Sequence, residues 1–265
     1  MTPTCDFAPH LIASGLVRPL DLAVERQLIP FFQRPPWLQQ RGRTYGAPYA
    51  FGSMWLRCLE PGTTPTRWRD LWDPRFRGRV AIWDDAVWAV TLAAMDLGLD
   101  PADLGDEELI EVEARLDALF DNGCRTWGTP EDALALVLEG DVVLVDDWGI
   151  LGRTLERRGV AFTTCVPERT AVWVDSWMLS AELSGDRLAA AEAWVEYALS
   201  PENQRDLLLL AGYSPTNRDT VRRLDKRSGL AQQRALEVQV NAMQLWPYLS
   251  RRGPYLELWQ RVKAR

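Results

Sequence analysis

An aspartate between two tryptophans is the pattern in this chain that most clearly suggests chemistry. Asp175 lies in the apolar run VWVDSWML, with Trp173 and Trp177 two residues to either side. Alternate side chains share one face of a β-strand, so the carboxylate and both indoles would point the same way. A carboxylate pairs with positive charge, and an indole face attracts a cation. The segment predicts a site for a small organic cation, although an edge aspartate between two core tryptophans would leave the same pattern.

Two acidic pairs follow short apolar runs elsewhere in the chain. Asp84 and Asp85 come after VAIW, and Asp146 and Asp147 come after VVLV. Ligands of open α/β sheets collect at the carboxyl ends of strands, so both pairs are candidates for ligand contact. The first pair also stands where a helix needs a capping aspartate. No helix is expected directly after the second pair, because a Trp-Gly dipeptide comes next, and a cleft would keep its carboxylates solvated.

The composition excludes several classes of protein. The hydrophobic share of 47% and the charged share of 25% are typical of soluble globular chains, and no run of about 18 apolar residues is present. A net charge of −7 argues against a nucleic-acid partner. The four cysteines and the single His10 fit no metal-ligand spacing and no nucleophile motif. We therefore expect no catalytic residues, no metal and no cofactor.

Apolar runs and helical patterns alternate along the chain. Helices are expected over 86–98, 106–120, 130–139, 186–199 and 201–210, with a charged helical stretch over 218–242 and an amphipathic helix at the C-terminus. Strands are expected around VAIW, VVLV and TAVWVDSWML, and in the Gly- and Pro-marked segment TYGAPYAFGSMWL. Such alternation implies βαβ units, and hence an α/β fold with parallel strand pairs.

Four segments, in order along the chain, carry a family resemblance: YGAPYAFGS, WRDLWDPRFRGRVAIWDDA, VWVDSWML and LSPENQRDLLLLAGYSPTN. Together they resemble the spermidine/putrescine-binding proteins of ABC importers, over nearly the whole chain. The resemblance implies a type II periplasmic-binding fold, in which two α/β lobes joined by crossing strands close over a ligand in the cleft between them. Lobe 1 would comprise 1–50 and 172–265, lobe 2 would comprise 54–168, and the crossing strands would lie at 46–53 and 169–176.

The same resemblance implies roles for individual residues. Trp173 and Asp175 match a Trp-x-Asp motif whose acid holds an ammonium group and whose indole packs on the ligand. Asp85 matches an amine-binding aspartate, and Tyr213, in GYSPTN, matches a tyrosine of the site.

The chain departs from the family pattern at several of these positions. Trp88 stands where a second acid is expected, and in TPTCDF Thr4 keeps a hydroxyl whereas Asp6 replaces an aromatic residue. A Trp-Asn-Gly-like turn reads Asp-Asp-Trp-Gly here, and Pro247 replaces a glutamine after Trp246. These departures argue against specificity for long polyamines but not against a cationic ligand. The full set of candidate contacts is Asp175, Trp173, Asp85, Tyr213, Asp146, Asp147, Trp148, Trp88, Thr4, Asp6 and Trp246.

The expected partners are a small polyamine-like cation and an ABC transporter permease, with the chain itself a monomer. Family members open with a strand, a helix and a second strand, and this chain starts just after them, so lobe 1 is expected to be incomplete at its N-terminus. We expect a periplasmic protein if a signal peptide lies upstream of Met1, and a cytoplasmic one if Met1 is the true start. The competing interpretation is a cytoplasmic enzyme or ligand sensor on the same fold, because a fold alone does not define a function.

Overall fold

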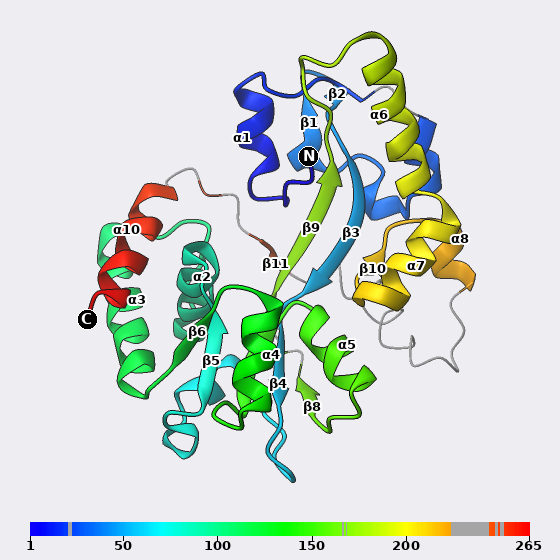
Figure 1. Ribbon diagram of the computed structural model, residues 1–265. Helices are drawn as coiled ribbons and strands as arrows, with labels where there is room; N and C mark the ends of the chain where they lie inside the picture. Colours follow the sequence, from blue (N-terminus) through cyan, green and yellow to red (C-terminus); the bar gives the residue numbers. More distant parts are fainter. Residues whose placement is uncertain (21–22, 166, 168, 224–243, 247–248, 250–251) are drawn as a thin grey trace. The chain divides into compact units, whose positions relative to one another are not determined.

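The computed structural model describes residues 1–20, 23–165, 167, 169–223, 244–246, 249 and 252–265. The chain divides into two units, labelled by element in Figure 1. Unit 1 comprises Met1–Gly52 and Val172–Tyr248, and unit 2 comprises Ser53–Ala171 and Leu249–Arg265. Each unit is an α/β structure built around its own sheet, so the expected fold class is confirmed.

Unit 1 is built on a sheet with the strand order β10-β3-β9-β11. Its strands are β3 (Ala47–Ser53), β9 (Ala171–Trp177), β10 (Ser214–Pro215) and β11 (Gln244–Leu245). The neighbouring strands β3 and β9 run in opposite directions (Figure 1). Both are mostly buried, which fits their apolar composition and places them at the centre of the unit.

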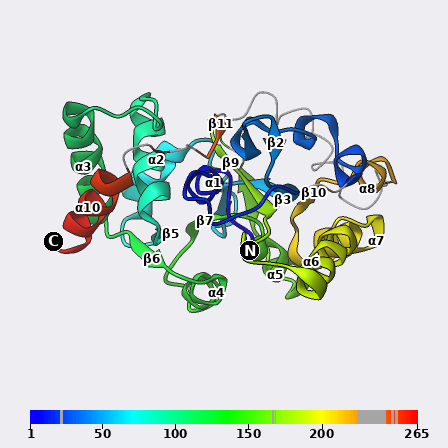
Figure 2. The ribbon, with the colours of Figure 1, turned by 90° about the horizontal axis from the view of Figure 1, so that it is seen from above.

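Helices and short turns surround this sheet. The α-helices are α1 (Ala8–Ala13), α6 (Gly185–Ala198), α7 (Pro201–Ala211) and α8 (Arg218–Arg223). Short 3₁₀-helices, labelled η, are η1 (Ala23–Gln27), η2 (Pro30–Phe32) and η3 (Pro36–Leu38). The short strands β1 (Gln39–Gln40) and β2 (Arg43–Thr44) pair with each other. Figure 2 shows α6 and α7 on one side of β3 and β9. Most of the charged stretch expected over 218–242 lies outside the described residues.

Unit 2 contains a five-stranded sheet with the order β6-β5-β7-β4-β8. Its strands are β4 (Trp55–Cys58), β5 (Val80–Trp83), β6 (Arg125–Trp127), β7 (Leu144–Asp147) and β8 (Thr163–Cys165). β5 pairs in parallel with β6 and with β7, whereas β4 pairs antiparallel with β7 and β8. The parallel pairs confirm the βαβ units expected from the sequence.

Capping residues fix the helices of unit 2. The α-helices are α2 (Ala86–Leu97), α3 (Asp106–Asp121), α4 (Pro130–Leu138), α5 (Ile150–Arg157) and α10 (Arg252–Lys263), with η4 (Trp68–Trp72) and η5 (Pro74–Phe76) before them. Asp85 accepts a hydrogen bond from the Trp88 amide at the start of α2, and Gly98 ends that helix at φ 83°. Thr129 caps α4 in the same way, with Pro130 in its first turn. No described helix is both long enough and apolar enough to cross a membrane.

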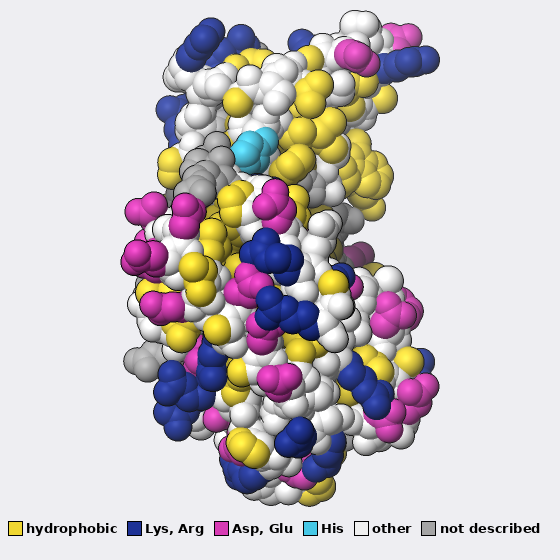
Figure 3. Space-filling model, turned by 90° about the vertical axis from the view of Figure 1, so that its left-hand side faces the viewer, with side chains coloured by type: hydrophobic (Ala, Val, Ile, Leu, Met, Phe, Trp, Pro, Cys, Tyr) yellow, Lys and Arg dark blue, Asp and Glu magenta, His cyan; other side chains and the backbone are white. Residues whose placement is uncertain are grey.

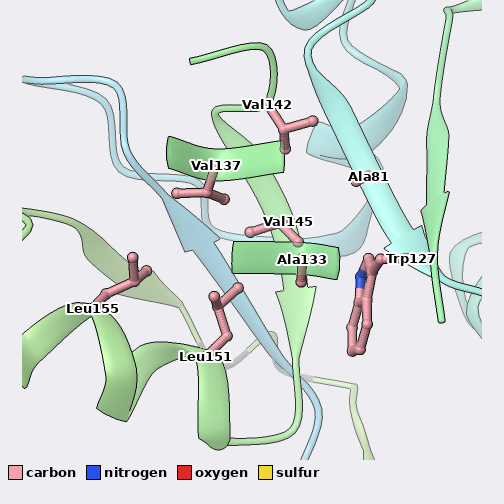
Figure 4. Close-up of a cluster of buried hydrophobic side chains, with 8 residues drawn as sticks. All are labelled: Ala81, Trp127, Ala133, Val137, Val142, Val145, Leu151 and Leu155. Carbon is pink, nitrogen blue, oxygen red and sulfur yellow. The ribbon is translucent and has the colours of Figure 1, made fainter. Parts of the chain in front are cut away.

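A cluster of buried side chains joins α4 and α5 to the sheet of unit 2. It contains Ala81, Trp127, Ala133, Val137, Val142, Val145, Leu151 and Leu155 (Figure 4). Because the parallel strand β5 is buried, its residues read as an unbroken apolar run, and β7, buried throughout, starts with Leu144 and Val145 before its two aspartates. This packing holds the carboxyl ends of β5, β6 and β7 in fixed positions.

The C-terminal helix belongs to unit 2, whereas the family resemblance implied a lobe 1 that includes all of 172–265. In α10, Tyr255, Leu258, Trp259 and Val262 are buried. The Trp259 indole donates to Asp84 Oδ1 at 2.8 Å, and Lys263 Nζ lies 2.6 Å from the same oxygen. Figure 3 shows acidic and basic side chains interspersed over α3 and α10, and Arg261 pairs there with Glu113 at 2.6 Å. Periodicity predicted this helix but could not show which apolar surface it covers.

The contacts of α10 give a first testable prediction. Trp259→Ala removes a side chain that is 4% exposed, so it should lower the free energy of unfolding by about 3–5 kcal/mol. Leu256→Ala, on the same helix but 43% exposed, should change it by less than about 1 kcal/mol. Urea unfolding of both variants measures the difference, and equal effects would show that α10 does not support unit 2.

Candidate ligand-binding site

Asp175 lies on a face of β9 that it shares with two tryptophans. Trp173 is buried, and its ring meets that of Tyr213 edge-on, with centroids 4.8 Å apart. Trp177, at the other side of Asp175, contacts Tyr49 of β3 at 5.3 Å between ring centroids. Tyr213 stands just after α7, which ends at Gly212 with φ 76°. The side chains expected from the alternation of a strand are therefore surrounded by aromatic rings from β3 and from the segment after α7.

The first residues of the chain run beside β9 and bring a second carboxylate close to Asp175. The Ser176 amide donates to the Pro3 carbonyl at 3.1 Å, and Thr4 and Asp175 form an antiparallel bridge. The Thr4 hydroxyl donates to the Asp6 carboxylate, and Asp6 is buried. Thr4 and Asp6, two of the candidate contacts, thus stand next to the tryptophan-flanked aspartate.

The environment of Asp175 disfavours its negative charge. Burial, followed by repulsion from Asp6, raises the pKa of this carboxyl to about 7. Its Oδ1 atom is buried and has no hydrogen-bond partner among the described residues. No basic side chain among these residues forms an ion pair with it. The indole N–H groups of Trp173 and Trp177 are equally without a described partner. Since buried polar groups almost always have partners, this face of β9 has the properties of a site completed by a ligand.

Asp146, in contrast, is fully satisfied inside unit 2. Its carboxylate accepts hydrogen bonds from the Trp83 amide at 2.9 Å, from the Trp127 indole at 2.8 Å and from the Trp88 indole. Complete burial raises the pKa of Asp146 to about 7, although these three N–H donors oppose the shift. Asp146 and Trp88 are both fully buried and are bonded to each other, and contact of either with a ligand stays a prediction. They tie β5, β6, β7 and α2 together.

Asp147 is structural as well, and the helix judged absent after it is present. Its carboxylate accepts from the amides of Gly149, Leu151 and Gly152, at 2.8, 3.1 and 3.0 Å, and so caps α5. A buried ion pair joins Asp147 Oδ2 to Arg57 Nη2 at 2.9 Å. The Trp-Gly dipeptide does not prevent a helix, because the capping carboxylate stands two residues before the N-cap Gly149.

The remaining candidates divide between the two units. In unit 2, half-buried Trp148 packs on Trp83 at 4.5 Å between ring centroids, and half-buried Asp85 caps α2. In unit 1, Trp246 is buried and its amide donates to the Val172 carbonyl at 2.7 Å. Pro247 lies outside the described residues.

Sequence reasoning missed two residues of the Asp175 site. Tyr49 contacts Trp177, and burial followed by the charge of Asp175 raises the pKa of this tyrosine to about 12. Gly52, in the same strand, lies under the indole of Trp173. The available signal was a glycine inside an apolar strand, which often marks close approach of another group.

Solved structures with this architecture include substrate-binding proteins of ABC transporters. The spermidine/putrescine substrate-binding protein PotD of Streptococcus pneumoniae is 19% identical, with a TM-score of 0.82 over 99% of this chain and 82% of that one. The Tp0655 (TpPotD) lipoprotein of Treponema pallidum is 16% identical, with a TM-score of 0.81 over 100% of this chain and 83% of that one. At these identities the likeness establishes the fold.

The family follows from the sequence. Residues 3–226 match the model of the family described as bacterial extracellular solute-binding protein, and the chain belongs to this family. The Spermidine/putrescine-binding periplasmic protein 1 of Haemophilus influenzae is 23% identical over 233 residues, which are 85% of this chain. The chain spans 63% of the length of that relative. The resemblance noted in the sequence is thereby confirmed at the level of the family.

The buried ion pair of Asp147 gives a second prediction. Arg57→Met leaves that carboxylate buried without its cation, so unfolding should become easier by about 3–5 kcal/mol. Arg125→Met breaks the pair with Asp141, whose side chains are 43% and 50% exposed, and should change stability by about 1 kcal/mol or less. Chemical denaturation compares the two, and a neutral Arg57→Met would contradict the structural role of Asp147.

Proposed function

We propose that this chain is the solute-binding subunit of an ABC importer and captures a small organic amine in its cationic form. The amine would pair with Asp175 on the aromatic face of β9, and the protein would perform no catalysis. The observation that carries the proposal is the carboxylate of Asp175, whose buried Oδ1 has no partner among the described residues. Family membership supports the role in solute capture.

The charges around Asp175 support a cation rather than an anion. Burial, and then repulsion from Asp6, raise the pKa of Asp175, and the two neighbouring carboxyl groups make this place favourable for positive charge. An anion would add a third negative charge, whereas an ammonium group would relieve the repulsion and donate hydrogen bonds to Oδ1. The ring of Trp173, held edge-on by Tyr213, would supply apolar and cation–π contact to the carbon chain of the ligand.

The relatives support a short diamine as the first ligand to test. The names of the similar proteins from H. influenzae and S. pneumoniae include spermidine and putrescine. We propose putrescine, or an amine of its size, because Trp88 replaces an acid expected in long-polyamine binders and is buried here. Contact of an amino group with Asp85 stays a prediction.

The proposed partner is the permease of the same importer, and the proposed compartment is the periplasm. The name of the curated relative includes the word periplasmic, and the family is one of extracellular solute-binding proteins. We propose that the protein works as a monomer, since a solute carrier of this kind needs one site and one docking surface.

The charge of Asp175 can be tested without changing the shape of its side chain. Asp175→Asn should weaken putrescine binding by about 2–5 kcal/mol, or roughly 30-fold or more, because a buried ammonium loses its ion pair. Asp206→Asn, which removes an exposed charge from the same unit, should leave affinity unchanged. Titration calorimetry measures both, with succinate as an anionic control of equal carbon length that should not bind. Unchanged affinity in Asp175→Asn would move this residue out of the site.

The raised pKa of Asp175 predicts how binding depends on pH. Below about pH 7 the carboxyl of the free protein is protonated, so affinity for an ammonium ion should rise about tenfold from pH 6 to pH 8 and then level off. The folding stability of the unliganded protein should show the opposite trend with pH. A carboxyl with a raised pKa in the folded state holds more protons than the unfolded chain, so its contribution to stability is lost as the pH rises from about 4 to about 7. Asp175→Asn should flatten the affinity profile, and a wild-type affinity that does not change with pH would contradict the assignment.

A further inference from the structure

Gly52 of β3 leaves room for the indole of Trp173. A Cβ atom at position 52 would lie 2.6 Å from Cζ2, 2.9 Å from Cε2 and 3.2 Å from Nε1 of that ring. The first two distances are shorter than any ordinary contact of a Cβ atom. The ring therefore occupies the volume that a side chain at position 52 would fill.

Space, and not backbone conformation, is what requires glycine at this position. Gly52 is a strand residue and is absent from the glycines with positive φ, so its backbone suits any amino acid. In contrast, Gly98 and Gly212 end helices with a left-handed backbone, a conformation that itself favours glycine. Gly52 thus acts through its neighbour in the site.

Trp173 has little freedom to yield to a new side chain. Its backbone is fixed between Val172 and Val174, which are 1% and 0% exposed. The residue is only 6% exposed, and its ring meets that of Tyr213 at 4.8 Å between centroids. A ring pushed away from β3 must turn over the face that it shares with Asp175, or displace Tyr213.

We infer that Gly52 is a positioning residue of the ligand site: its missing side chain lets Trp173 lie against β3 and keeps the face of Asp175 open to an amine. The inference rests on the proposed function, because it assumes that the amine binds at Asp175. Any residue larger than glycine at position 52 would push the indole of Trp173 toward the ligand and narrow the site.

The test is a double-variant cycle with putrescine as the ligand. Gly52→Ala should weaken putrescine binding at least about tenfold in the wild-type background. In a Trp173→Phe background the shorter ring lacks the atoms that clash, so the same alanine should change affinity less than about threefold. Gly253→Ala is the matched control, because a Cβ atom there meets nothing within 4 Å, and it should leave affinity unchanged.

Each possible result of the cycle has a distinct meaning. A Gly52→Ala variant that binds as tightly as the wild type, or that loses affinity equally in both backgrounds, overturns the role of Gly52. A wild-type protein that binds no amine contradicts the proposed function instead. In that case urea unfolding of the same four proteins still decides whether Gly52 positions the indole. Destabilisation by the alanine only when Trp173 is present supports the inference, and equal destabilisation in both backgrounds overturns it.

Discussion

One buried acid, Asp175 on an aromatic face of β9, determines the properties of the proposed ligand site. A buried carboxylate is costly unless it is paired or hydrogen-bonded, and here Asp6 stands close enough to raise the cost further. Its Oδ1 has no partner among the described residues, although the N-terminal segment runs beside it through the bridge with Thr4. A fold that keeps such a group destabilises its own free state, and a bound cation removes that penalty. Ligand affinity and the instability of the empty site are thus two consequences of the same burial.

The aspartates of unit 2 show what a buried carboxylate looks like when the protein itself satisfies it. Asp146 receives three N–H donors from β5, β6 and α2, and Asp147 receives a guanidinium group and three helix amides. The pKa of Asp146 is raised to about 7, as is that of Asp175, so a raised pKa alone does not distinguish a ligand site from a structural tie. The hydrogen-bond partners do distinguish them. We therefore place the proposed ligand site at the unsatisfied acid rather than at the most deeply buried one.

The sequence was sufficient for elements whose signals are local. Gly98 and Gly212 marked the ends of α2 and α7, and the spacing of Trp173, Asp175 and Trp177 predicted their common face. It was insufficient wherever the decisive partner is distant in sequence. One of the two indoles that donate to Asp146 comes from Trp88, 58 residues away, and the surface that buries α10 lies on helices more than a hundred residues earlier. The helix after Asp147 was missed for a subtler reason, since the capping carboxylate reaches past Trp148 to amides of α5. Composition and periodicity cannot tell a solvated acid from one bonded by a remote ring.

If a bound amine replaces a proton on Asp175, calorimetry in two buffers measures that exchange directly. Putrescine is titrated into the protein at pH 6.5, once in phosphate and once in a buffer with a much larger heat of ionisation. With a pKa of about 7 for the free carboxyl, binding should release about three quarters of a proton, so the observed heats should differ in proportion. In Asp175→Asn the difference should vanish. Equal heats in both buffers for the wild type, despite clear binding, would contradict the account.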